Sequence, residues 1–340
     1  LPKVGEEVKL LDRSPLAAGA MYRRSAWEQI GGYNESLDYQ EDYDFWIKFI
    51  TKFDVHNVNL PLMYYRQHGS SMSTNFSARM NARRDVKRSF VETNSTFEDT
   101  EVLGIIPARA EDRIDLPSDV DGPLSLVEID DRPLIDFTIA EVQNTQHVDR
   151  LLVSTEDEAI AEVARELGAE VPFLRDEMLS SPTTQLVDVI ESLLERLWAT
   201  EDYEPDVLAI LPYVSPLRTA EHVDEAIDTS LIFSVDSVIS VYENSDFLWQ
   251  PGKYGLKPLF EERLLRQDRE SMYHENGAIY VTTPEIVLRR NELIGQHVGH
   301  ILMEERNSLH IDSRFDFDIC SHLLESPGAI SHAPSELQRE

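Results

Sequence analysis

Val102-Leu-Gly-Ile-Ile-Pro-Ala-Arg109 is the stretch that sets the fold of the larger part of this chain. It is an apolar run of strand length, followed by a polar loop that extends to Gly122, as is typical of a buried strand. Strand-like and helix-like segments then alternate. The expected strands are Val102–Ile106, Arg150–Ser154, Asp206–Leu211 and Ala278–Val281, and the expected helices are Pro133–Asn144, Asp157–Leu167, Gln185–Thr200 and Ala220–Ser230. The alternation predicts an α/β fold with a doubly wound, mostly parallel sheet.

Charge is distributed unevenly along the 340 residues, whose net charge is −32. Residues 1–100 carry 14 acidic and 13 basic side chains, whereas residues 101–340 carry 49 acidic and 18 basic ones. This change in net charge along the chain predicts two modules, 1–90 and 102–325, joined by a linker at 91–101 and followed by a tail at 326–340.

The acidic surface also bears on partners and on salt. Only two of the 18 basic residues after residue 100 are lysines, Lys253 and Lys257. Concentrated salt screens such self-repulsion, so we expect halophilic adaptation, with simple solubility as the alternative. Nucleic acid is not an expected partner, because binding phosphates needs a basic patch.

The remaining composition favours a soluble cytoplasmic protein. The single Cys320 excludes an internal disulfide and a multi-cysteine zinc site. No apolar run is long enough to span a bilayer, and the first residues lack the apolar core of a signal peptide. Because the chain begins at Leu1, we expect a fragment or a processed product. The basic segment 79–90 predicts a helix with a solvated face, and peripheral membrane contact is the less favoured alternative.

The amino-terminal module carries spaced motifs in a fixed order. Gly31-Gly-Tyr33 is followed by Glu41-Asp-Tyr-Asp-Phe-Trp46 and then by Tyr65-Arg-Gln-His68. Apolar residues at helical spacing follow the acidic cluster. The cluster therefore lies at a helix N-terminus, where the helix dipole favours carboxylates.

Over residues 17–75 these motifs resemble the carboxy-terminal part of family 2 glycosyltransferases, which have the GT-A fold. The resemblance implies that Asp42 is the general base on an acceptor hydroxyl and that Glu41 lies on the acceptor side. It places Arg66 and His68 near the leaving phosphates. The half of that domain that binds the sugar nucleotide is missing here, so we expect no transferase activity from this segment.

Six further motifs follow in order in the acidic module. They are Ile105-Ile-Pro-Ala-Arg109, Pro133-Leu-Ile135, Val153-Ser-Thr-Glu-Asp157, Pro212-Tyr-Val-Ser-Pro-Leu-Arg-Thr219, Asp236-Ser-Val-Ile-Ser240 and Asn276-Gly-Ala-Ile-Tyr280. Over residues 102–325 they resemble the acylneuraminate cytidylyltransferases, or CMP-sialic acid synthetases. The resemblance implies a homodimer and attack of a nonulosonic acid hydroxyl on CTP, with Mg²⁺ or Mn²⁺, for surface glycan biosynthesis.

Ligands of doubly wound sheets bind at the carboxyl ends of the strands, so we expect the site after Ile106 and Leu211. By resemblance, Arg109 and Arg113 meet the nucleotide phosphates. Ser215 and Arg218 are expected to line the same mouth.

The resemblance assigns the sugar acid to Arg266, Gln267 and Asn276, since a guanidinium pairs well with a carboxylate. For Asn276-Gly277 a tight turn before the next strand is an equal alternative. By the same resemblance, the expected metal ligands are Asp312, His310 and Asp316. Alternatively, residues 312–318 are the charged start of the final helix, and His310 is a poor ligand for Mg²⁺.

The loop 110–121 departs from the family, because it carries five acidic residues and lacks the glycines and second lysine of the phosphate loop. Two functions therefore remain open. One is an active cytidylyltransferase. The other is a catalytically degenerate binding or scaffold domain attached to a glycosyltransferase.

Overall fold

The computed structural model describes residues 20–55, 76–112, 114, 122–260, 262–263 and 272–325. Its α-helices are α1 (Arg24–Ile30), α2 (Glu41–Ile50), α3 (Phe76–Glu92), α4 (Leu134–Gln143), α5 (Glu158–Glu166), α6 (Leu186–Glu201), α7 (Ala220–Phe233), α8 (Pro284–Arg290) and α9 (Arg314–Glu325). Its strands are β1 (Val102–Pro107), β2 (Glu128–Ile129), β3 (Arg132–Pro133), β4 (Arg150–Ser154), β5 (Val207–Ile210), β6 (Ser237–Asn244), β7 (Trp249–Gly252), β8 (Gly255–Pro258), β9 (Met272–Thr282) and β10 (Val298–Leu302). Short 3-10 turns are η2 (Ser95–Phe97), η3 (Leu124–Leu126) and η4 (Glu177–Ser180).

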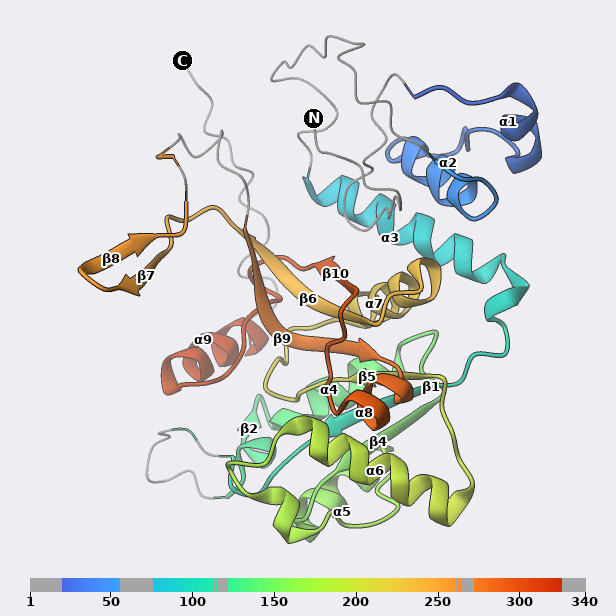
Figure 1. Ribbon diagram of the computed structural model, residues 1–340. Coiled ribbons are helices and arrows are strands. Elements are labelled where there is room, and N and C mark those ends of the chain that lie inside the picture. Colours follow the sequence, from blue (N-terminus) through green and yellow to red (C-terminus); the bar gives the residue numbers. More distant parts are fainter. Residues whose placement is uncertain are drawn as a thin grey trace.

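The main sheet of the described part has six strands in the order β10-β6-β9-β5-β1-β4 (Figure 1). β1 pairs in parallel with β4 and β5, and β10 pairs in parallel with β6. β9 runs antiparallel between β5 and β6. The predicted α/β fold with a mostly parallel sheet is confirmed, with one antiparallel strand inside it.

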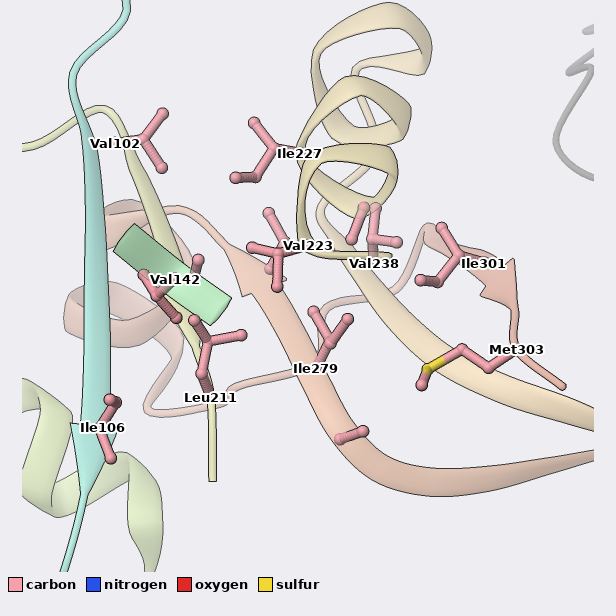
Figure 2. Packing of buried hydrophobic residues seen from close by; sticks show 14 of the residues in the cluster. Val102, Ile106, Val142, Leu211, Val223, Ile227, Val238, Ile279, Ile301 and Met303 are labelled. Atoms are coloured by element: carbon pink, nitrogen blue, oxygen red, sulfur yellow. The ribbon is translucent and has the colours of Figure 1, made fainter. Parts of the chain in front are cut away.

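Helices cover both faces of this sheet because side chains along each strand alternate between the faces. Val102 and Ile106 of β1 face the larger cluster, which contains buried residues of α4, α5 and α7. Leu103 and Ile105 face the other cluster, with α6 and α8. Figure 2 shows side chains of β1, α7 and β9 converging in the larger cluster. The sheet is therefore doubly wound, as predicted.

The four helices predicted in the acidic module form as α4, α5, α6 and α7, each within three residues of its expected ends. Local capping explains one of these boundaries. The Asp157 carboxylate accepts a hydrogen bond from the Ile160 amide at 2.9 Å, which satisfies a free donor at the start of α5.

The amino-terminal helices form a group that docks on the acidic module. α2 packs against α3, and α3 lies along α7 (Figure 1). Aromatic rings join α2 to the segments around α1, with Tyr33 stacked on Phe45 at 4.6 Å between ring centroids. The acidic cluster does begin α2, where Glu41 and Asp42 are exposed.

The structure corrects the prediction of a solvated face on helix 79–90. Lys87 of α3 is only 2% exposed, and its Nζ donates to Glu225 at 2.9 Å and to Thr229 at 3.0 Å, both on α7. Arg84 donates to the same Glu225 at 3.2 Å, and Arg83 donates to Gln40 at 2.6 Å. These three basic side chains of α3 thus serve an internal interface, which also leaves them unsuited to a membrane surface. None of the described helices is long and apolar enough to cross a membrane.

The predicted domain boundary stays a prediction. Between α3 and β1 the chain forms the short turn η2, where the Thr96 amide donates to the Asn94 side chain at 3.3 Å. The predicted tail at 326–340 lies outside the described residues.

Candidate active site

A cavity of about 770 Å³ lies at the carboxyl ends of β1 and β5, where the sequence predicted the site. Its wall combines the segments after β1 and β5, the segment 175–189, parts of β6 and β9, and the segment 308–316. The polar and aromatic residues of this wall include Arg109, Asp112, Arg175, Thr184, Tyr213, Tyr242, His274, Glu275, Asn276, Tyr280, His310, Asp312 and Asp316.

Arg109 follows β1 and reaches the cavity, as predicted. Its side chain is 34% exposed and pairs with Asp112, with Nη2 at 2.7 Å and Nε at 2.8 Å from Oδ1. Nη1 donates to the Ser181 carbonyl at 3.3 Å. The guanidinium is therefore held in place by a carboxylate that belongs to the altered loop.

Asp112 has a second partner. The buried Tyr213 hydroxyl donates to its Oδ2 at 3.1 Å. Burial and then the Asp112 charge raise the pKa of Tyr213, so the phenol keeps its proton and remains a donor. Tyr213 therefore fixes one oxygen of Asp112 while Arg109 holds the other.

The structure adds two site residues that the sequence analysis missed. Arg175 is 7% exposed and lines the cavity, and its Nη2 contacts Oε2 of Glu156 at 2.5 Å. Glu156 Oε1 accepts from the Ala110 amide at 2.8 Å. A lone arginine in the apolar run Val171-Pro-Phe-Leu-Arg175 is the signal that could have pointed to this pair.

The predicted metal ligands His310, Asp312 and Asp316 line the cavity. His310 Nδ1 is 3.1 Å from the buried Ser215 hydroxyl, and His310 Nε2 is 3.4 Å from Oδ1 of Asp312, whose side chain is 82% exposed. Asp316 instead accepts from the Ser313 hydroxyl at 2.6 Å and from the Asp312 amide at 3.3 Å. Asp316 is thus engaged at the start of α9, as the helix alternative expected. Within the described ranges no group of three or more His, Cys, Asp or Glu side chains could hold a metal ion.

Asn276 lies at an irregularity inside β9 and not in a tight turn between strands. The pairing of β6 with β9 shifts register between Ile239 and Val241, and Gly277 adopts a left-handed φ of 68°. The Asn276 carboxamide accepts from Ser240 at 2.5 Å and donates to Ser308 at 2.9 Å. The bulge thereby turns a fixed amide toward the cavity wall.

Ser215 and Arg218 do not line the cavity as expected, because both are buried and absent from its described lining. The Arg218 guanidinium donates to the Ala278 carbonyl at 2.6 Å, to the Pro212 carbonyl at 3.2 Å and to the Thr138 hydroxyl at 2.9 Å. Burial lowers the pKa of Arg218 to about 9. The residue ties the loop after β5 to β9, which is a structural contact.

The other predicted site residues take no part in the described cavity. Glu41 and Asp42 are absent from its lining and lie on α2. The remaining predicted site residues lie outside the described ranges: Arg66, His68, Arg113, Arg266 and Gln267.

The sheet and the cavity at its carboxyl edge define a nucleotidyltransferase-like α/β fold. A 4-diphosphocytidyl-2C-methyl-D-erythritol synthase from Anaerococcus prevotii matches with a TM-score of 0.51 and 12% identity, over 68% of this chain and 100% of that one. A CMP:2-keto-3-deoxy-manno-octonic acid synthetase complexed with CTP matches with a TM-score of 0.50 and 11% identity, over 67% of this chain and 100% of that one. These likenesses show the fold.

Sequence comparison indicates which proteins with this fold the chain resembles. Residues 125–200 match the family model described as Cytidylyltransferase. The chain is 27% identical over 230 residues to a CMP-N,N'-diacetyllegionaminic acid synthase of Legionella pneumophila, covering 66% of this chain and 96% of the relative. It is 28% identical over 208 residues to the post-translational flagellin modification protein B of Campylobacter coli, covering 58% and 86%.

An N-acylneuraminate cytidylyltransferase of Escherichia coli is 27% identical over 226 residues, which are 65% of this chain but only 51% of the relative. The prediction of a cytidylyltransferase is confirmed by these findings. The glycosyltransferase resemblance of residues 17–75 stays a prediction.

Proposed function

We propose that this chain transfers the cytidylyl group of CTP to the hydroxyl of a nonulosonic sugar acid, forming a CMP-sugar and pyrophosphate. The main observation behind this proposal is the cavity of about 770 Å³ at the carboxyl end of β1, which is lined by Arg109. Its volume lies within the range of about 300–1,000 Å³ that is usual for small-molecule sites. The activities for which the Legionella and Escherichia coli relatives are named support CTP and this class of sugar.

At the nucleotide end, Arg109 offsets negative charge on the triphosphate. The sugar hydroxyl oxygen forms a bond to the α-phosphorus and releases its proton to solvent, while the bond from the α-phosphorus to the oxygen that bridges it to the β-phosphate breaks. Negative charge therefore accumulates on the departing pyrophosphate. A guanidinium beside these oxygens stabilises that charge. We assign Arg113 to the same phosphates, as the resemblance implies.

The part of the wall formed by β6 and β9 suits the sugar. Tyr242, His274 and Glu275 line the cavity there together with Asn276. These groups offer donors and acceptors for hydroxyl and amide substituents. Arg266 and Gln267 are our candidates for the sugar carboxylate, since a paired guanidinium contact matches its geometry.

Asp312 is the described carboxylate that best fits a divalent ion at this site. It is exposed at the cavity edge, and Mg²⁺ usually binds one or two carboxylates together with substrate phosphates. When bound, the ion would supply positive charge next to the triphosphate. His310 is better suited to orienting Asp312 than to binding Mg²⁺, because Mg²⁺ prefers oxygen.

We propose in addition that the protein forms a homodimer through the β7–β8 hairpin. The hairpin projects from the sheet (Figure 1), and Tyr254 and Leu256 at its end are 93% and 70% exposed. Exposed apolar side chains on a projecting element favour burial against a second copy. Light scattering should give the dimer mass for the wild type and the monomer mass for Leu256→Glu. A wild type that stays monomeric at all concentrations would reject the dimer.

Nucleotide-dependent thermal stabilisation tests the proposed function. CTP should raise the melting temperature, whereas ATP, GTP and UTP should leave it unchanged, because a ligand stabilises only the state that binds it. No shift with any nucleotide from a folded protein would favour the degenerate binding or scaffold domain instead. That alternative draws its support from the Arg109–Asp112 pair, in which the phosphate-binding cation already has a carboxylate partner.

A further inference from the structure

The loop that carries Arg109 is held at both of its flanking peptides by one buried ion pair. Arg175 Nη2 donates to the Ala108 carbonyl at 3.2 Å, just before Arg109. Glu156 Oε1 accepts from the Ala110 amide at 2.8 Å, just after it. The two side chains also bind each other, with Nη2 at 2.5 Å from Oε2.

The pair is itself fixed by its surroundings. The Arg175 and Glu156 side chains are 4% and 11% exposed. Arg175 Nε donates to the Ser180 hydroxyl at 3.1 Å, and the Arg175 amide donates to the Thr155 carbonyl at 2.8 Å. Partial burial alone would raise the pKa of Glu156, but hydrogen bonds from Ala110, Ser180 and Arg175 lower it on balance, so the carboxylate stays ionised at neutral pH.

Both Glu156 oxygens and Nη2 of Arg175 are engaged by the backbone around residue 109 and by each other, while Arg175 also lines the cavity. A buried ion pair is weak evidence for stability by itself, because desolvation cancels much of the attraction. Its geometry here, with one contact on each side of a single residue, points to a role in fixing that residue.

We infer that Glu156 and Arg175 are positioning residues that hold the Arg109 loop in the geometry needed to bind the nucleotide phosphates. The inference rests on the proposed function for its ligand, and it concerns the arrangement of the loop, which exists without nucleotide. An error of about 1 Å in the placement of a binding group can reduce its effect by up to about a hundredfold.

The test compares wild type, Glu156→Ala, Arg109→Ala and the double variant, with Glu170→Ala as the matched control. Glu170 also binds an arginine, Arg150, but at the opposite end of β4. The first readout is hydrogen–deuterium exchange without nucleotide. Glu156→Ala should speed exchange on the order of tenfold in a peptide covering residues 108–112 and leave residues 207–210 unchanged. Unchanged exchange at 108–112 would overturn the inference.

The second readout is the Kd for CTP by calorimetry. Glu156→Ala should weaken binding on the order of tenfold in the presence of Arg109 and have little effect in Arg109→Ala, because the pair acts through that side chain. An equal loss in both backgrounds would contradict a positioning role, and Glu170→Ala should match wild type. If Glu156→Ala does not fold, Glu156→Gln replaces it with the same expected signs, since it retains an oxygen for Ala110 but loses the charge. A folded wild type that binds no CTP would reject the proposed function, while the exchange readout would still decide whether the loop is held.

Discussion

Two ion pairs in this molecule use the same chemistry in opposite settings. Lys87 and Glu225, which join α3 to α7, are 2% and 1% exposed. Arg109 and Asp112, at the mouth of the cavity, are 34% and 22% exposed. Both join a cation to a carboxylate at less than 3 Å. The buried pair has no solvent to replace a lost partner, whereas the open pair can exchange its carboxylate for another anion.

The difference teaches that exposure separates a structural ion pair from one available to a ligand. Breaking a buried pair leaves an uncompensated charge, while breaking an exposed one exchanges it for water or for a phosphate. The following predictions test that distinction, beginning with the largest effect.

Lys87→Ala should lower the free energy of unfolding by about 3–5 kcal/mol, because it leaves Glu225 buried without its main cation. Chemical denaturation measures this effect. The control is Arg24→Ala, which removes an i,i+4 pair with Glu28 whose side chains are 89% and 53% exposed. That change should cost less than about 1 kcal/mol. Equal losses for the two variants would break the comparison.

The Glu225 pair should also depend on pH. Burial alone would raise the pKa of Glu225, but Lys87 and Arg84 bring it below its usual value of 4.5. A lowered folded-state pKa stabilises above the unfolded value and loses that stabilisation as the pH falls through the folded one. The difference in unfolding free energy between wild type and Glu225→Gln should therefore be full above pH 4.5 and shrink below it. A difference that grows on acidification would contradict the assigned pairing.

Arg109→Ala should reduce kcat/KM for CTP by about 10²–10³-fold, the loss expected for a group that stabilises charge in the transition state. Its melting temperature should stay close to that of wild type, because the side chain is partly exposed. Arg289→Ala, which removes an exposed pair with Glu285, is the control and should keep full activity. Unchanged turnover in Arg109→Ala would show that the phosphates bind elsewhere.

Asp112→Asn should have the smallest effect and the opposite sign. Asparagine keeps an oxygen for the Tyr213 hydroxyl but removes the charge that competes for Arg109, so the KM for CTP should fall about threefold. Steady-state kinetics at low salt measures the change. A higher KM would mean that Asp112 orients Arg109 for binding and does not compete with phosphate.

Local pattern was sufficient for much of the fold. Apolar runs and helical periodicity located β1, β4 and β5 and the four helices between and after them. Each of these elements buries one face or is buried entirely, so the spacing of its own apolar residues indicates its type. The antiparallel insertion of β9 was not predicted, since strand direction depends on partners far along the chain. The solvated face on α3 was wrong for the same reason, because Glu225 lies 138 residues after Lys87.

The site was predicted less completely than the fold. Arg109, Asn276 and His310 do line the cavity. Arg109 follows a strand whose carboxyl end lies there, whereas Asn276 lies at a bulge inside β9. Arg218 is of a residue type that often binds phosphate, but its guanidinium donates to the buried carbonyls of Pro212 and Ala278. The sequence alone does not show these contacts. The apolar run before Arg175 marks that arginine in the sequence, but its pairing with Glu156 is visible only in the structure, because both contact the backbone of another loop.

Pyrophosphate release from CTP, with Mg²⁺ or Mn²⁺ and a small panel of nonulosonic acids, tests the central claim most directly. It should be run at about 0.1 M and at multimolar KCl, because screening should favour both the folded acidic module and access to Arg109. The account predicts release that requires a sugar acid and increases with salt. If folded protein releases no pyrophosphate at any salt concentration, the account is contradicted, and a binding or scaffold domain becomes the better interpretation.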